Sequence, residues 1–111
     1  MAKIALSGAT LWVENIANLA AVTSATNGVK LETRWYKDLS VFVNVSVNTG
    51  AVTVSIEASN DGTTWYELDS KTYTAATGTD VFSYSSHLPY LRTKTATQSN
   101  STVTTTITGS S

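Results

Sequence analysis

The sequence predicts an all-β fold, an antiparallel β-sandwich, because apolar and polar residues alternate over long runs that turn residues separate. Two such runs lie within residues 39–69, LSVFVNVSVNTGAVTVSIEASNDGTTWYELD. In the first run one face of the strand carries Leu39, Val41, Val43, Val45 and Val47, and the other face carries Ser40, Asn44 and Ser46. In the second run one face carries Val52, Val54, Ile56 and Ala58, and the other face carries Thr53, Ser55, Glu57 and Ser59. A period of two indicates strands with one buried face and one solvated face.

The N-terminal segment, residues 1–28, precedes these runs and has an ambiguous pattern. It combines a roughly helical spacing at Trp12, Ile16, Leu19 and Val22 with a strand-like alternation at Leu11, Trp12 and Val13. We expect an extended arm or an edge strand here, with a short helix as the alternative. Asn27-Gly28 is a turn signal, since both residues tolerate positive φ. The sandwich domain is then expected over residues 29–109.

Turn residues divide that domain into short strands. Asn48-Thr49-Gly50 is expected to close a hairpin between the two alternating runs, and Asn60-Asp61-Gly62 to end the second run. Further strands are predicted at 64–69, 71–75 and 79–85, before a break at Pro89. A closing hairpin is predicted from 90–97 and 102–108 around residues 98–101, with Val103, Thr105 and Ile107 on one face. Seven to eight strands of this length are typical of an Ig-like or jelly-roll-like sandwich.

Composition excludes several classes of protein. The 111 residues suffice for one domain with its own core, and the absence of cysteine excludes disulfides and thiolate metal sites. A net charge of -1 with 14% charged residues argues against nucleic-acid binding. The start, MAKIALSGATLW, lacks the apolar core of a signal peptide, and no run approaches the ~20 apolar residues that span a membrane. We therefore expect a soluble protein that is made in the cytoplasm.

The polar residues are unusual in kind, since twenty are threonine and fourteen are serine. Threonine is β-branched and suits a strand, while its hydroxyl keeps the strand surface solvated. A strand exterior of this composition repels other proteins weakly. It therefore favours packing against them.

No group of residues predicts catalysis, a cofactor or a metal. His87 is the single histidine and has no recognisable partner for a catalytic triad or dyad in the sequence. The acids Glu57, Asp61, Glu67 and Asp69 surround a turn, but their spacing matches no EF-hand loop. We expect no enzyme activity and no cofactor.

The aromatic residues Trp65, Tyr66 and Tyr84 predict an alternative function, carbohydrate binding, because flat rings stack on sugars. If a strand begins at Thr64, Trp65 and Tyr66 point to opposite faces and one of them belongs to the core. Packing in the core or in an interface is the competing explanation for these rings.

A more specific resemblance rests on the order SVFVNVSVNTGAVTVSIEASNDGTTWYEL followed by LPYLRTKTATQSNSTVTTTITG. This order resembles small β-sandwich modules of bacteriophage virions, found in capsid decoration (cement) proteins, head fibres and tail-associated proteins. The likeness covers residues 39–109, about two thirds of the chain. Similar SNDGTxW segments also occur in bacterial surface and carbohydrate-binding sandwiches.

The resemblance implies a non-enzymatic virion structural protein that decorates and stabilises a bacteriophage capsid. Its implied partner is the major capsid protein, and its implied form is a homotrimer on the capsid exterior, synthesised in the host cytoplasm, with no nucleic acid or membrane partner. Many copies would add small contact energies into a large total. Subunit or capsid contacts are expected at Ile4, Leu6, Leu11 and Trp12. A carbohydrate-binding or tail-fibre adhesion module is the alternative.

Overall fold

The computed structural model describes residues 2–5, 12–85 and 87–110, with side chains described from residue 16 onward. This part of the chain holds seven strands and no helix: β1 (Ala2–Ala5), β2 (Trp12–Val22), β3 (Leu31–Glu32), β4 (Asp38–Ser59), β5 (Tyr66–Thr74), β6 (Gly78–Tyr84) and β7 (Tyr90–Ser110). The all-β prediction is confirmed. Nowhere in these ranges is there a helix long and apolar enough to cross a membrane.

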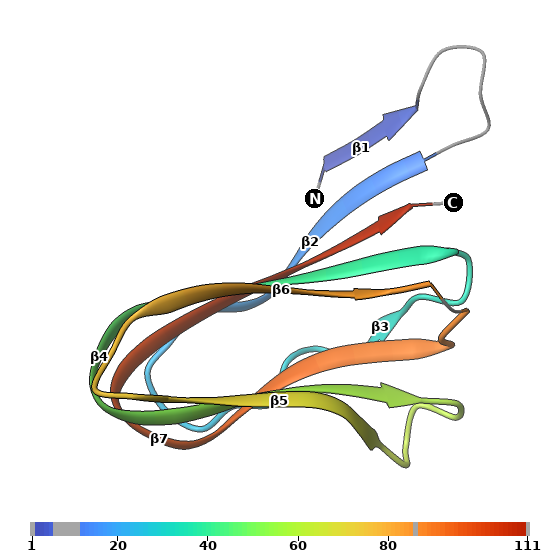
Figure 1. Cartoon of the computed structure of the whole chain (residues 1–111). Coiled ribbons are helices and arrows are strands. Elements are labelled where there is room, and N and C mark those ends of the chain that lie inside the picture. Colours follow the sequence, from blue (N-terminus) through green and yellow to red (C-terminus); the bar gives the residue numbers. More distant parts are fainter. Residues whose placement is uncertain (1, 6–11, 86, 111) are drawn as a thin grey trace.

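Two long strands, β4 and β7, form the centre of the fold and pair antiparallel along almost their whole length. Both bend sharply, so the continuous sheet folds over itself into two layers (Figure 1). Layer I contains β6, residues 38–48 of β4, residues 101–110 of β7, and then β2 and β1. Layer II contains β5, residues 51–59 of β4, residues 90–99 of β7, and β3. The molecule is therefore an antiparallel sandwich whose two central strands run through both layers.

The core lies between the layers and consists of the alternating apolar residues that the sequence predicts. The buried cluster contains Leu39, Val41, Val43, Val45, Val52, Val54, Ile56, Ala58, Tyr73, Leu91, Val103 and Ile107. In β4 the buried positions change from odd to even numbers across the bend, which keeps apolar side chains inside in both layers. Thr105 is also fully buried, as the predicted face of Val103, Thr105 and Ile107 requires.

The two predicted hairpins at the bends are wrong. Residues 48–50 and 98–101 lie inside continuous strands, and each half of β4 pairs with β7 rather than with the other half. Thr97 and Asn100 adopt positive φ values of 50° and 46° in the bend of β7. A Cβ on Gly50 would clash with the carbonyl oxygen of Ser99, so glycine lets the two bends approach this closely. The same residues therefore form a corner between layers, not a turn within one sheet.

Three smaller expectations also differ from the structure. The strands predicted at 64–69 and 71–75 form one strand, β5. The helical alternative for the N-terminal segment does not occur, since residues 12–22 form β2. Val47, expected in the core, is 52% exposed, because a register shift between Val45 and Val47 interrupts the alternation.

A chain of buried hydrogen bonds joins the layers on the side of β2. The backbone N–H of Leu19 donates to Thr105 Oγ1, which donates to Thr93 Oγ1, which donates to Asn18 Oδ1. Asn18 also accepts from the backbone N–H of Thr93 and donates from Nδ2 to the carbonyl of Val29. Because the side chains of Asn18, Thr93 and Thr105 all have hydrogen-bond partners, this polar seam replaces apolar packing without leaving any of the three unpaired.

The opposite side of the sandwich is held by contacts between the edge strands β5 and β6. The hydroxyl of Tyr73 donates to Asp80 Oδ2 at 2.5 Å, and the hydroxyl of Tyr84 donates to Asp69 Oδ2 at 2.5 Å. Lys71 adds an ion pair with Asp80 at 2.9 Å. We call these contacts the tyrosine clasp. Since charged residues on edge strands oppose pairing with other chains, the clasp also protects both edges.

Candidate functional site

The outer face of layer I is broad, and among its described outward positions the one charged side chain is Asp38, at the start of β4. The outward positions nearest the middle of this face, which we call the uncharged face, are Ala17, Ser40, Phe42, Asn44, Thr79, Val81, Ser83, Thr104, Thr106 and Thr108. They follow from the strand register, because buried and outward residues alternate along β4, β6 and β7. Hydroxyl, amide and apolar groups therefore make up this surface.

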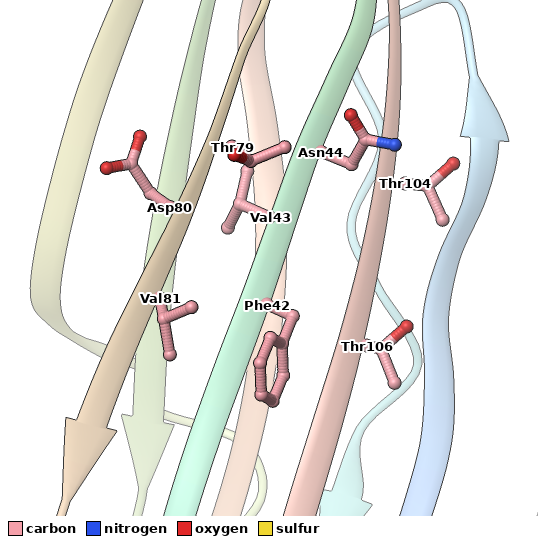
Figure 2. Close-up of a pocket in the computed structure, with 8 residues that line it drawn as sticks. All are labelled: Phe42, Val43, Asn44, Thr79, Asp80, Val81, Thr104 and Thr106. Atoms are coloured by element: carbon pink, nitrogen blue, oxygen red, sulfur yellow. The ribbon is translucent and has the colours of Figure 1, made fainter.

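Two exposed apolar side chains occupy the middle of the uncharged face. Phe42 is 45% exposed and Val81 is 56% exposed, and the two residues are direct cross-strand partners. On its other side, Phe42 pairs with Thr106 of β7. A hollow of about 580 Å³ surrounds Phe42, and its lining residues come from β4, β6 and β7 (Figure 2). A projecting ring thus lies next to an open hollow on the same face.

Asp80 is the charged residue among the eight that line this hollow. Its carboxylate belongs to the tyrosine clasp, where it accepts from Tyr73 and Lys71 of β5. The hydrogen bond from Tyr73, followed by that from Lys71, lowers the pKa of Asp80. In turn, burial and the bond to Asp80 raise the pKa of the Tyr73 hydroxyl. The charge is therefore compensated within the molecule and adds little field to the uncharged face.

The outer face of layer II differs in both charge and cover. Glu57, expected to be solvated, is only 9% exposed, and its carboxylate contacts Arg92 at 2.9 Å and Lys94 at 3.8 Å. The guanidinium of Arg92 lies 4.1 Å from the centre of the Trp65 ring. Ser55 and Ser59, also expected to be solvated, are buried too. The segment after β4 folds back over this face, so its polar groups are satisfied internally.

The Asn-Asp-Gly turn confirms its predicted structural role. Asp61 Oδ1 accepts hydrogen bonds from Ser59 Oγ and from the backbone N–H groups of Thr63 and Thr64. These bonds, that from Thr64 first, lower the pKa of Asp61. Over the ranges that the structure describes, no three His, Asp or Glu side chains are arranged to hold a metal ion. His87 lies exposed, with Nδ1 3.3 Å from the carbonyl oxygen of Arg34.

The predicted contact residues of the N-terminal segment lie at one edge of layer I or outside the described residues. Ile4 belongs to β1, where it pairs with Val13, and Trp12 begins β2, where it pairs with Ala5. Leu6 and Leu11 lie outside the described residues. Figure 1 shows β1 and the start of β2 at the margin of the sheet, where β1 contacts β2 alone among the described strands.

The three aromatic residues of the carbohydrate prediction lie on different parts of the molecule. Trp65 covers Arg92 on layer II, and Tyr84 belongs to the tyrosine clasp. Tyr66 is 60% exposed beside a hollow of about 260 Å³ that Leu88 and Pro89 also line. The expectation that Trp65 or Tyr66 belongs to the core is wrong, because a loop rather than a strand holds Trp65.

Three exposed apolar residues were not among the predicted contact residues: Trp35, Phe42 and Val81. Trp35 is 63% exposed in the loop before β4. Phe42 could have been found, since it falls between Ser40 and Asn44 in the polar half of the alternation. Exposed apolar residues indicate a contact surface when they lie together, as Phe42 and its cross-strand partner Val81 do.

Comparisons with known proteins show likeness in fold alone. No protein-family model matches the chain, and no curated protein matches its sequence significantly. The crystal structure of YomS, a protein derived from the SPBc2 prophage, has a TM-score of 0.71 and 11% identity, covering 96% of this chain and 100% of that chain. A structure of disulfide-linked Bacillus endospore appendages has a TM-score of 0.50 and 14% identity, covering 96% of this chain and 94% of that one.

A CBM4 structure covers 97% of this chain and 71% of that chain at 16% identity, but its TM-score of 0.45 is too low to support an inference. The disulfide links of the endospore appendages have no counterpart here, because this chain contains no cysteine. At these identities the comparisons establish a shared β-sandwich architecture, found also in a prophage-derived protein.

Proposed function

We propose that this protein is a non-enzymatic structural protein of a bacteriophage particle, which decorates and stabilises the capsid through protein–protein contacts. The observation that carries the proposal is the uncharged face, with Phe42 and Val81 exposed at its centre. Exposed apolar groups that are surrounded by uncharged polar residues are typical of surfaces that contact other proteins. Catalysis would instead call for titratable groups gathered in a cleft.

Two further observations support this function. The fold is shared with a prophage-derived protein over the whole length of that chain. The edge strands β5 and β6 carry the charged tyrosine clasp, which opposes uncontrolled edge-to-edge association. A protein that must form a defined layer on a particle benefits from contact faces combined with blocked edges.

For the contact with the major capsid protein we propose the N-terminal segment, with Ile4, Leu6, Leu11 and Trp12. Its strand β1 pairs with β2 at the margin of layer I, so the segment can be removed without taking a central strand away. On this proposal the protein is made in the host cytoplasm and lies on the capsid exterior.

The test is co-sedimentation of the purified protein with particles of the phage that encodes it, followed by counting of bound copies per particle. Hundreds of copies would support a decoration protein. A few copies would replace the proposal by a tail or fibre role, and no binding would overturn it. A variant that lacks residues 2–13 should keep a cooperative melting transition but lose particle binding. Retained binding by this folded variant would exclude the N-terminal contact.

One observation favours a second candidate, carbohydrate binding at the end of the sandwich where Tyr66 lies. The Tyr66 ring is exposed beside an apolar hollow, as a sugar-stacking ring must be. Tyr66→Ala should then abolish retention on a glycan array without lowering the melting temperature. Arrays that retain neither the parent protein nor the variant would remove this candidate.

A further inference from the structure

The uncharged face has properties that suit it to contact a second copy of itself. Its polar groups are hydroxyls and one amide, and each of these both donates and accepts hydrogen bonds. When two such faces meet, a donor of one copy can therefore always find an acceptor on the other, and no like charges come into contact across these positions. The net charge of the chain is only -1, so two copies repel each other little as they approach.

The shape of the face provides a projection and a recess side by side. Phe42 projects from β4 with 45% of its surface exposed, and the hollow of about 580 Å³ next to it is lined by Val81 and Thr79 on one side and Thr104 and Thr106 on the other (Figure 2). A two-fold rotation about an axis through this face places the ring of each copy over the hollow of the other. An isologous contact of this kind closes by itself and forms a dimer.

We propose that two copies of this chain pair face to face through the uncharged face, with Phe42 of each copy in the hollow beside Phe42 of the other. The proposal goes beyond the function proposed above, because this pairing requires no particle. It leaves β1 of both copies at the margins of the pair, where this strand can contact a capsid. It also specifies a two-fold dimer in place of the trimer that the virion resemblance implies.

The size of the face sets the expected strength of the pair. Four strands spaced about 4.8 Å apart and about eight residues long give roughly 500 Å² per copy. The pair would then bury about 1,000 Å², which is near the lower limit for a specific interface. We therefore expect a concentration-dependent dimer, in which one central aromatic residue contributes much of the affinity.

The test is sedimentation equilibrium of the purified full-length chain over a wide concentration range, without phage particles. The proposal requires a reversible monomer–dimer equilibrium that Phe42→Asp weakens at least about 30-fold, since a buried charge replaces the central contact. The matched control is Val29→Asp, because Val29 is 66% exposed but lies outside the uncharged face. This control should leave the dimer constant unchanged. Unchanged melting temperatures would show that both variants are folded.

A second pair of variants tests the orientation. Val81→Lys should also yield monomers, and an equimolar mixture with Phe42→Asp should restore a mixed dimer, because the lysine of one copy then faces the aspartate of the other. A monomer at every concentration, a trimer, or a dimer that neither variant weakens would each overturn the proposal. If the parent protein forms the dimer but does not bind phage particles, the proposed function is overturned and the dimer proposal stands.

Discussion

The two outer faces of the sandwich have the same strand geometry but opposite chemistry. On layer I, Phe42 and Val81 are exposed among hydroxyl groups. On layer II, Glu57 is covered and held by Arg92, which itself stacks on Trp65. Layer II thus completes its contacts within the chain, whereas layer I leaves an apolar centre open. The outer side chains of layer II therefore stabilise the fold, while the apolar centre of layer I remains accessible to solvent.

The physical reason for this difference is the length of the connections. The segment that follows β4 contains an Asn-Asp-Gly turn and returns across layer II, bringing Trp65 over Arg92. The described residues show no comparable cover above Phe42 and Val81, which stay accessible. Substitutions on layer II should therefore lower the free energy of unfolding, whereas substitutions at the apolar centre of layer I should mainly weaken association.

The largest expected effect is on layer II, from Glu57→Ala. The side chain of Arg92 is 18% exposed, so loss of its carboxylate partner leaves a largely buried charge unpaired. We expect a loss of about 2–4 kcal/mol in the free energy of unfolding, measured by urea denaturation. Glu67→Ala is the control, because Glu67 lies directly opposite Glu57 but is exposed. An equal effect of both substitutions would contradict the internal role of the Glu57–Arg92 pair.

An intermediate effect is expected at the tyrosine clasp, from Tyr73→Phe. Tyr73 is 6% exposed and donates to the carboxylate of Asp80, so removal of its hydroxyl should cost about 1–2 kcal/mol at neutral pH. Tyr66→Phe should have no measurable effect, because Tyr66 is 60% exposed.

The difference in stability between the parent protein and Tyr73→Phe should also depend on pH. The pKa of Asp80 is lowered in the fold. Its contribution to the free energy of unfolding is therefore present above the pKa of the unfolded state, near 4, and is lost as pH falls through the lower pKa of the folded state. The pKa of Tyr73 is raised, so its contribution is complete below about pH 10 and declines as pH rises above that value. The difference should therefore be greatest between these limits. A difference that stays constant into acid would show that the clasp does not involve the Asp80 carboxylate.

The smallest effect on stability is expected on layer I, from Phe42→Ser. Because the Phe42 ring is already 45% exposed in the fold, its replacement should cost less than about 1 kcal/mol. The adjacent Val41 faces the core with 0% exposure, and Val41→Ala should cost about 2 kcal/mol. Thermal and urea unfolding of both variants provide the comparison. A cost at Phe42 as large as that at Val41 would mean that Phe42 supports the fold instead of a contact.

The sequence predicted the buried side chains of β4 better than it predicted their partners. The alternation of Val41, Val43 and Val45, and then of Val52 and Val54, correctly identified core residues on both sides of Gly50. A hairpin and a corner both place these residues inside, so the pattern is the same for both. The choice depends on hydrogen bonds to β7, whose paired residues lie 31 to 72 positions further along the chain, and no local signal specifies them.

The candidate site shows the same division. The sequence identified strand exteriors of serine and threonine, but it could not show that Phe42 and Val81 are cross-strand neighbours, because β4 and β6 are separated by β5 along the chain. It also could not show that Glu57, predicted to be solvated, lies under Arg92 and Trp65. Whether the side chains on a sheet face are covered depends on whether a segment from elsewhere in the chain packs over that face.

Local periodicity and the backbone preferences of single residues were enough to predict the strand class, most of the inward-facing residues and the Asn-Asp-Gly turn. The sequence could not show that β4 and β7 turn corners, that the tyrosine clasp closes one side, or that one face is covered while the other stays open. These features arise from contacts between residues far apart in the sequence, whose free energies exist only once both layers have come together.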